Sequence, residues 1–104
     1  MQRIAFKMKL HPGQEAEYQR RHSALWPELA ALLKAAGVED YSIFLDPETL
    51  ILFAYLRIAD PAALAEMRTH DIMWKWWDQM KDIMDVYPDT SPVTSPLKEL
   101  FYLP

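Results

Sequence analysis

The stretch that decides the fold is a hairpin of sixteen residues. It reads Tyr41-Ser42-Ile43-Phe44-Leu45, then Asp46-Pro47-Glu48-Thr49, then Leu50-Ile51-Leu52-Phe53-Ala54-Tyr55-Leu56. Two runs rich in aromatic and branched residues, separated by four residues typical of a turn, predict antiparallel strands joined by a hairpin. The second run is apolar at successive positions, which predicts a central strand covered on both faces.

On the N-terminal side of the hairpin lie a predicted strand and a helical region. Residues 3–10 alternate apolar and mostly basic side chains, the period of a half-buried strand. Helical sequence runs from about Gln14 to Ala36 and stops before Gly37, which suits the position after a helix end. Pro27 lies inside this region, so we expect either a kink or two helices.

On the C-terminal side, Asp60-Pro61 is a typical helix start. The helical sequence continues to about Met84, with a possible break near residues 69–71, and residues 97–103 are predicted to form a last strand. The order β-α-β-β-α-β is that of the ferredoxin-like α+β fold, in which helices cover one face of a sheet. We expect a single domain over 1–104, with a second copy of the chain covering the open face in a homodimer, a dimeric α/β barrel.

Composition excludes several classes of function. The chain has no Cys, only two Gly and a net charge of −4. These values argue against a disulfide framework, a thiol nucleophile, a phosphate-binding glycine loop and a nucleic-acid partner. No His spacing suits a metal, and we expect neither a metal nor a cofactor. Charges near the N-terminus and short apolar runs argue against a leader or membrane span, so a cytoplasmic location is expected.

His22 is the residue whose chemistry is hardest to assign from the sequence. It shares a helical stripe with Tyr18, Leu25 and Leu29, which places it on the face that packs against the sheet. A histidine in such a stripe can be a core residue with a satisfied hydrogen bond, or an acid–base group beside the Tyr18 hydroxyl. Spacing does not decide between these roles. His11 and His70 lie near element ends, where surface or capping roles are expected.

Aromatic side chains form the second candidate group. Trp76 and Trp77 lie in a stripe of Met and aromatic residues that core packing alone could explain, but they point about 100° apart on a helix. One ring can therefore pack while the other lines a cavity and stacks on a polyhydroxylated ligand such as a sugar or on a flat ligand. Tyr41, at the start of a strand, adds a ring with a hydroxyl. The proline-rich residues 85–96 form either a functional loop or a rigid cover.

Four stretches carry a resemblance to a known family. They are Tyr18-Gln19-Arg20-Arg21-His22 with Leu25-Trp26-Pro27-Glu28-Leu29; Tyr41-Ser42-Ile43-Phe44-Leu45-Asp46; Trp76-Trp77; and Pro88-Asp89-Thr90-Ser91-Pro92-Val93 with Phe101-Tyr102-Leu103-Pro104. In this order, and over nearly the whole chain, the sequence resembles the L-rhamnose mutarotases.

The resemblance implies a dimeric ferredoxin-like fold and an isomerase that interconverts the α and β anomers of L-rhamnose. It implies His22 as the proton donor and Tyr18, Tyr41, Trp76 and Trp77 as substrate-binding residues. Two other classes stay open from the residues alone. One is a cofactor-independent monooxygenase on the same dimeric fold, and the other is a non-catalytic module for ligand sensing or dimerisation.

Overall fold

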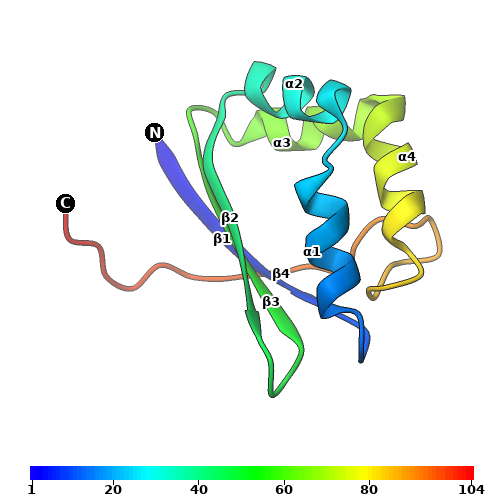
Figure 1. Cartoon of the computed structure of the whole chain (residues 1–104). Helices are drawn as coiled ribbons and strands as arrows, with labels where there is room; N and C mark the ends of the chain where they lie inside the picture. Colours follow the sequence, from blue (N-terminus) through cyan, green and yellow to red (C-terminus); the bar gives the residue numbers. More distant parts are fainter.

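The computed structural model describes all 104 residues as one four-stranded sheet with helices packed on one side (Figure 1). The strands are β1 (Gln2–Lys9), β2 (Val38–Asp46), β3 (Ile51–Ile58) and β4 (Ser95–Pro96). They lie in the order β2-β3-β1-β4, and every neighbouring pair is antiparallel. The predicted α+β fold with ferredoxin-like βαββαβ order is confirmed.

β3 is the central strand that the hairpin sequence predicted. On its helix-facing side Leu52, Ala54, Leu56 and Ile58 are at most 2 % exposed. On the other side Phe53 is 36 % exposed and its neighbour Phe44, on β2, is 67 % exposed. Within one chain only one face of the sheet is therefore covered.

The first helical region is two helices, as Pro27 allowed. α1 (Glu15–Ser23) ends before the bend, and α2 (Pro27–Ala35) begins with proline in its first turn. Trp26 has extended backbone angles, as expected of a residue before proline. The predicted stripe therefore continues around a bend, with Tyr18 on α1 and Leu29 on α2 both buried. Gly37 follows α2 at φ +85°, a conformation that favours glycine.

The second helical region is divided near residues 69–71, as expected. It consists of α3 (Ala62–Glu66), the 3-10 turn η1 (Met67–Thr69) and α4 (Asp71–Met80). The Ala62 N–H donates to the Asp60 carboxylate at 3.0 Å. The expected end near Met84 is wrong, because α4 stops at Met80. Residues 83–85 instead pair with the chain at the end of β1. The His11 N–H donates to Ile83 O at 2.9 Å, and the Asp85 N–H donates to Lys9 O at 3.0 Å.

The predicted strand over residues 97–103 is also wrong. Pairing with β1 ends after the Leu97 N–H donates to Ala5 O at 2.9 Å, and residues 98–104 make no backbone hydrogen bond. Arg3 holds this tail through two 2.8 Å bonds to Glu99 and by stacking 3.3 Å from the centre of the Tyr102 ring. Figure 1 shows the tail leaving the sheet on the side away from α1 and α4.

None of the helices combines the length and the apolar character that crossing a membrane requires.

Candidate active site

A cavity of about 890 Å³ lies between the helices and the covered face of the sheet. Its volume falls in the range of roughly 300–1,000 Å³ that is typical of small-molecule sites. The structure brings all five of the predicted site residues to its wall, from α1, β2 and α4: Tyr18, His22, Tyr41, Trp76 and Trp77. Most of the other wall residues are apolar, so polar groups are few and define the orientation of a ligand.

The two ring nitrogens of His22 have different environments. Nδ1 lies 3.0 Å from the carbonyl oxygen of Tyr18, one turn earlier on α1. Because a carbonyl only accepts, Nδ1 must be the protonated nitrogen, and Nε2 carries the lone pair in the neutral ring. Nε2 makes no hydrogen bond and is not sealed from solvent. The sequence left two roles open for His22, a core residue with a satisfied hydrogen bond and an acid–base group. The two are compatible, because Nδ1 makes the hydrogen bond and Nε2 is free to exchange a proton.

Aromatic contacts fix the plane of the His22 ring. It stacks on Tyr18 with ring centres 4.2 Å apart, and it meets Trp76 edge-on at 5.4 Å. Burial lowers the pKa of His22 below its usual value, and the hydrogen bond to the Tyr18 carbonyl opposes this only in part. The imidazole is therefore mainly neutral near pH 7, and its protonated form is a stronger acid than free imidazole.

The two tyrosines of the site stay protonated at neutral pH. Burial raises the pKa of Tyr18 well above its usual value, and the Tyr41 phenol raises it further. Tyr41 is exposed over 40 % of its surface, yet the sheltered position of its hydroxyl raises its pKa to about 12. Both hydroxyls are therefore suited to donating hydrogen bonds, and neither is suited to being a base.

A β-bulge directs Tyr41 into the cavity. Glu39 pairs with Arg57 and Ser42 with Tyr55, so β2 contains one more residue than β3 between these pairs. The extra residue changes which positions face the helices, from even numbers at Val38 to odd numbers at Ile43. Asp40 takes up the irregularity at φ +51°. Without this bulge Tyr41 would point to the opposite face of the sheet.

The adjacent tryptophans have separate environments, as their helical positions predicted. Trp76 is buried, with its ring edge-on to Trp26 at 5.2 Å and to His22 at 5.4 Å. Trp77 is half-buried and edge-on to Trp74 at 4.7 Å. Trp26 and Trp74 pack edge-on against these two rings.

Sequence reasoning missed the two charged residues of the cavity wall, Glu15 at the start of α1 and Arg68. Arg68 lies in η1 with its guanidinium 5.3 Å from the centre of the Trp77 ring and 3.6 Å from the Asp89 carboxylate. Its position just before the predicted helix break near residues 69–71 gave no sign of this location. The proline-rich segment also reaches the cavity through Pro92, Thr94 and Pro96.

The other two histidines lie outside the cavity. His11 bridges Asp85, at 3.0 Å from Nε2, and the Asp82 carbonyl, at 3.3 Å from Nδ1. His70 is exposed at the start of α4 and makes no side-chain capping bond. No group of three or more His, Asp or Glu side chains is placed to hold a metal ion.

Fold and cavity together define a small ferredoxin-like α+β protein with one imidazole in a cavity of aromatic rings and phenol hydroxyls. Comparison with known families gives the particular one: the family model described as L-rhamnose mutarotase matches residues 3–103. The chain belongs to the L-rhamnose mutarotase family, a family of carbohydrate isomerases.

Individual relatives agree with this assignment over the full length. The L-rhamnose mutarotase of Bacteroides thetaiotaomicron is 53 % identical and that of Rhizobium meliloti 52 % identical, each covering 99 % of both chains. The crystal structure of an L-rhamnose mutarotase from Formosa agariphila superposes with a TM-score of 0.93 at 50 % identity, covering 100 % of both chains. The monooxygenase and the non-catalytic module are not favoured.

Proposed function

We propose that this chain interconverts the α and β anomers of L-rhamnose, with His22 as the proton donor and Tyr18, Tyr41, Trp76 and Trp77 as the substrate-binding residues. One observation supports this most strongly: Nδ1 of His22 is held by the Tyr18 carbonyl, while Nε2 is free at a cavity wall that carries hydroxyls and aromatic rings. A fixed tautomer with one free nitrogen is the arrangement that proton transfer needs.

Nε2 performs both proton transfers of ring opening. The neutral imidazole first takes the proton of the anomeric hydroxyl, so that a carbon–oxygen double bond forms at the anomeric carbon. The bond from that carbon to the ring oxygen breaks, and its electron pair stays on the ring oxygen, which receives the proton back from Nε2. Rotation about the bond next to the aldehyde and reversal of these steps close the ring as the other anomer. The ring oxygen and the anomeric hydroxyl share one carbon, so a single nitrogen reaches both.

The aromatic rings supply the sugar site. An indole face suits the C–H face of a sugar, and phenol hydroxyls donate to sugar oxygens. Trp76 is buried against Trp26 and His22, whereas Trp77 keeps exposed surface. We therefore assign the larger share of sugar affinity to Trp77.

Anomer exchange in the purified protein is the decisive test. Saturation-transfer NMR on L-rhamnose measures the rate at which magnetisation passes between the two anomeric protons, with the uncatalysed rate subtracted. We expect exchange proportional to protein concentration. Binding of the sugar without faster exchange would leave only a sensing module, and the absence of both would refute the proposed function.

We also propose a homodimer formed through the open face of the sheet. Phe44 and Phe53 form an exposed apolar patch on that face, and the exposed side chains of Leu100, Phe101 and Leu103 lie on the tail that Arg3 of β1 holds. Apolar surface of this kind on a small protein is typical of an interface, and a second copy supplies a matching surface by two-fold symmetry.

A further inference from the structure

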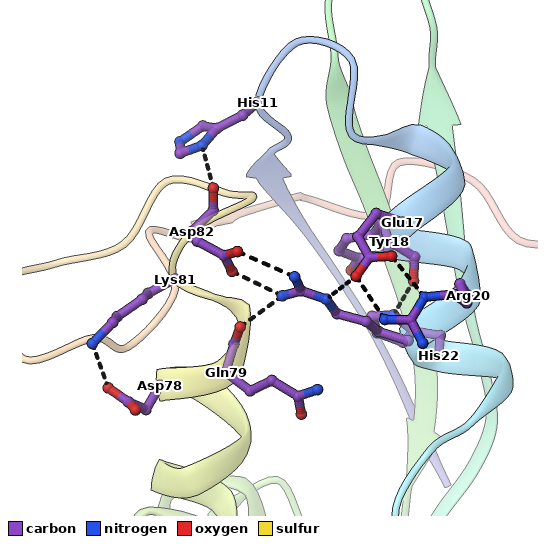
Figure 2. Close-up of polar contacts among 10 residues, drawn as sticks. His11, Glu17, Tyr18, Arg20, His22, Asp78, Gln79, Lys81 and Asp82 are labelled. Carbon is purple, nitrogen blue, oxygen red and sulfur yellow. Dashed lines mark hydrogen bonds and ion pairs between the residues drawn. The ribbon is translucent and has the colours of Figure 1, made fainter.

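Arg21 precedes His22 on α1, and its guanidinium bonds Gln79 of α4 and Asp82 just after that helix. Figure 2 labels these two partners together with Glu17 and His22 of α1. Nη1 donates to the Gln79 carbonyl at 2.6 Å and to Asp82 Oδ1 at 2.8 Å, and Nη2 donates to Asp82 Oδ2 at 3.1 Å. Nε donates to Glu17 at 2.8 Å on its own helix. One guanidinium therefore joins α1 to the last turn of α4 and the residues just after it.

Several physical features make this contact stiff. The Arg21 side chain is only 11 % exposed, so water competes weakly for its hydrogen bonds. The planar fork bonds both oxygens of Asp82, which fixes orientation as well as distance. α4 has no basic residue in its last turn, and Arg21 supplies a cation to the carbonyl end of that helix from outside. Hydrogen bonds from Arg20 and Arg21 lower the pKa of Glu17 to about 2, and the hydrogen bonds from Arg21 lower the pKa of Asp82.

The contact lies beside the proposed catalytic ring. Arg21 and His22 are consecutive on α1, and Trp76, which meets His22 edge-on at 5.4 Å, precedes Gln79 by one turn of α4. The same two helices are thus joined twice, by the ring contact that faces the cavity and by the guanidinium one turn further along. A shift at the guanidinium contact would move His22 relative to Trp76.

We propose that Arg21 is a positioning residue: by holding α1 against the end of α4, it fixes Nε2 of His22 relative to the sugar on the tryptophan wall. This inference rests on the proposed function of His22. Arg21 does not line the cavity in which we place the sugar. Proton transfer depends steeply on geometry, and a displacement of about 1 Å can lower a rate by roughly 100-fold.

Arg20 provides a matched control on the same helix. It forms two bonds of 2.6 and 2.7 Å to the same Glu17 carboxylate, but its side chain is 66 % exposed and makes no hydrogen bond or ion pair to another element. Arg20→Gln therefore removes the same charge and a comparable ion pair without loosening α1 from α4. Asp82→Asn breaks the same contact from the α4 side, by removing the carboxylate that Arg21 binds. Because Asp82 is exposed, this substitution should not prevent folding.

The test measures kcat and KM for anomer exchange at a temperature well below the melting point of every variant. We expect Arg21→Gln to lower kcat by about 10- to 100-fold with less than a threefold change in KM, and Arg21→Lys to recover part of the loss. Asp82→Asn should lower kcat in the same direction. The double variant should be no worse than Arg21→Gln alone, because both changes break one contact. Arg20→Gln should behave as the unmodified protein.

The NMR shifts of the His22 ring protons at pH 8 provide a second readout, since they report the ring currents of Tyr18 and Trp76. We expect them to move in Arg21→Gln and not in Arg20→Gln. If Arg21→Gln lowers only the melting temperature, with kcat and these shifts unchanged, Arg21 is merely structural and the inference is wrong. If Arg21→Gln does not fold, the Asp82→Asn kcat and shifts decide in the same way. Loss of exchange in His22→Ala together with wild-type exchange in Arg21→Gln would refute the inference alone, whereas unchanged exchange in His22→Ala would refute the proposed role of His22.

Discussion

The two faces of the sheet use the same strands for different purposes. On the helix face, bulky apolar residues of β1 and β3 line one side of the cavity, and the aromatic and imidazole rings of α1 and α4 line the opposite side. On the outer face, Phe53 of β3 and Phe44 of the neighbouring β2 form an exposed apolar patch beside the basic residues of β1. A period of two therefore separates the proposed sugar site from the proposed interface in one small sheet, and substitutions on one face should leave the property of the other unchanged.

The sharpest test of this separation is His22→Ala. We expect the catalysed exchange of L-rhamnose anomers to fall by about 10²- to 10⁴-fold, because the acid–base nitrogen is removed, while the molecular mass in solution stays the same. Saturation-transfer NMR and sedimentation measure the two properties. His11→Ala is the control, since this histidine lies outside the cavity. Equal loss in both variants would contradict the assignment.

The corresponding test of the outer face is Phe44→Asp. A charge in the centre of an apolar interface should weaken self-association by about 100-fold, roughly 3 kcal/mol, and the signals of the cavity residues should not shift. Sedimentation over a range of protein concentrations measures the dissociation constant. Glu48→Lys, in the turn between β2 and β3, is the charge-change control. A monomeric unmodified protein would show that this face is not an interface between copies.

The pH dependence probes the helix face alone. Since the neutral form of His22 starts the reaction and burial lowers its pKa, kcat/KM should be flat above pH 6.5. It should fall about tenfold per unit once the pH drops below the lowered pKa. Stability follows the same sign, because the unfolded chain binds the proton more readily: the contribution of His22 is complete above about pH 6.5 and is lost as the pH falls through its folded pKa. Exchange that increases towards pH 5, after subtraction of the uncatalysed rate, would contradict this order of proton transfers.

The smallest expected effect concerns the tryptophan wall. Trp77→Ala should raise KM by about two- to tenfold through loss of stacking worth roughly 0.5–1.5 kcal/mol, with little change in kcat. Initial rates of exchange at increasing sugar concentration measure both constants. Trp74→Phe is a useful control because it keeps an aromatic ring beside Trp77. A fall in kcat with unchanged KM would show that Trp77 acts on the reaction step and not on affinity.

The sequence predicted the order of elements well because each depends on local signals. Pro27 divides the first helical region, Gly37 follows its end, and Asp60 opens the second. The errors occur where a distant segment competes for the backbone. Residues 83–85 pair with the end of β1 although their side chains continue a helical pattern. The tail after Leu97 has strand-like residues, yet only the Arg3 side chain holds it.

The candidate site shows the same limit. Its residue types and helix positions were visible in the sequence, and all five line one cavity. What spacing could not provide was the orientation of Tyr41, because an extra residue in a strand shows no pattern before the partner strand is known. Arg68 and Arg21 were missed for a related reason. Their partners Asp89 and Asp82 are 21 and 61 residues away, and only folding brings them into contact.

The hydrogen bond that orients His22 has a consequence for how the site can vary. Its acceptor is a main-chain carbonyl four residues earlier in the same helix. Any residue that keeps α1 helical at position 18 supplies that carbonyl, so no side-chain substitution removes it. The tautomer of His22 is therefore protected against point mutation. Substitutions of the rings around the cavity can change sugar selectivity while the hydrogen bond within α1 keeps Nε2 of His22 as the proton-transferring nitrogen.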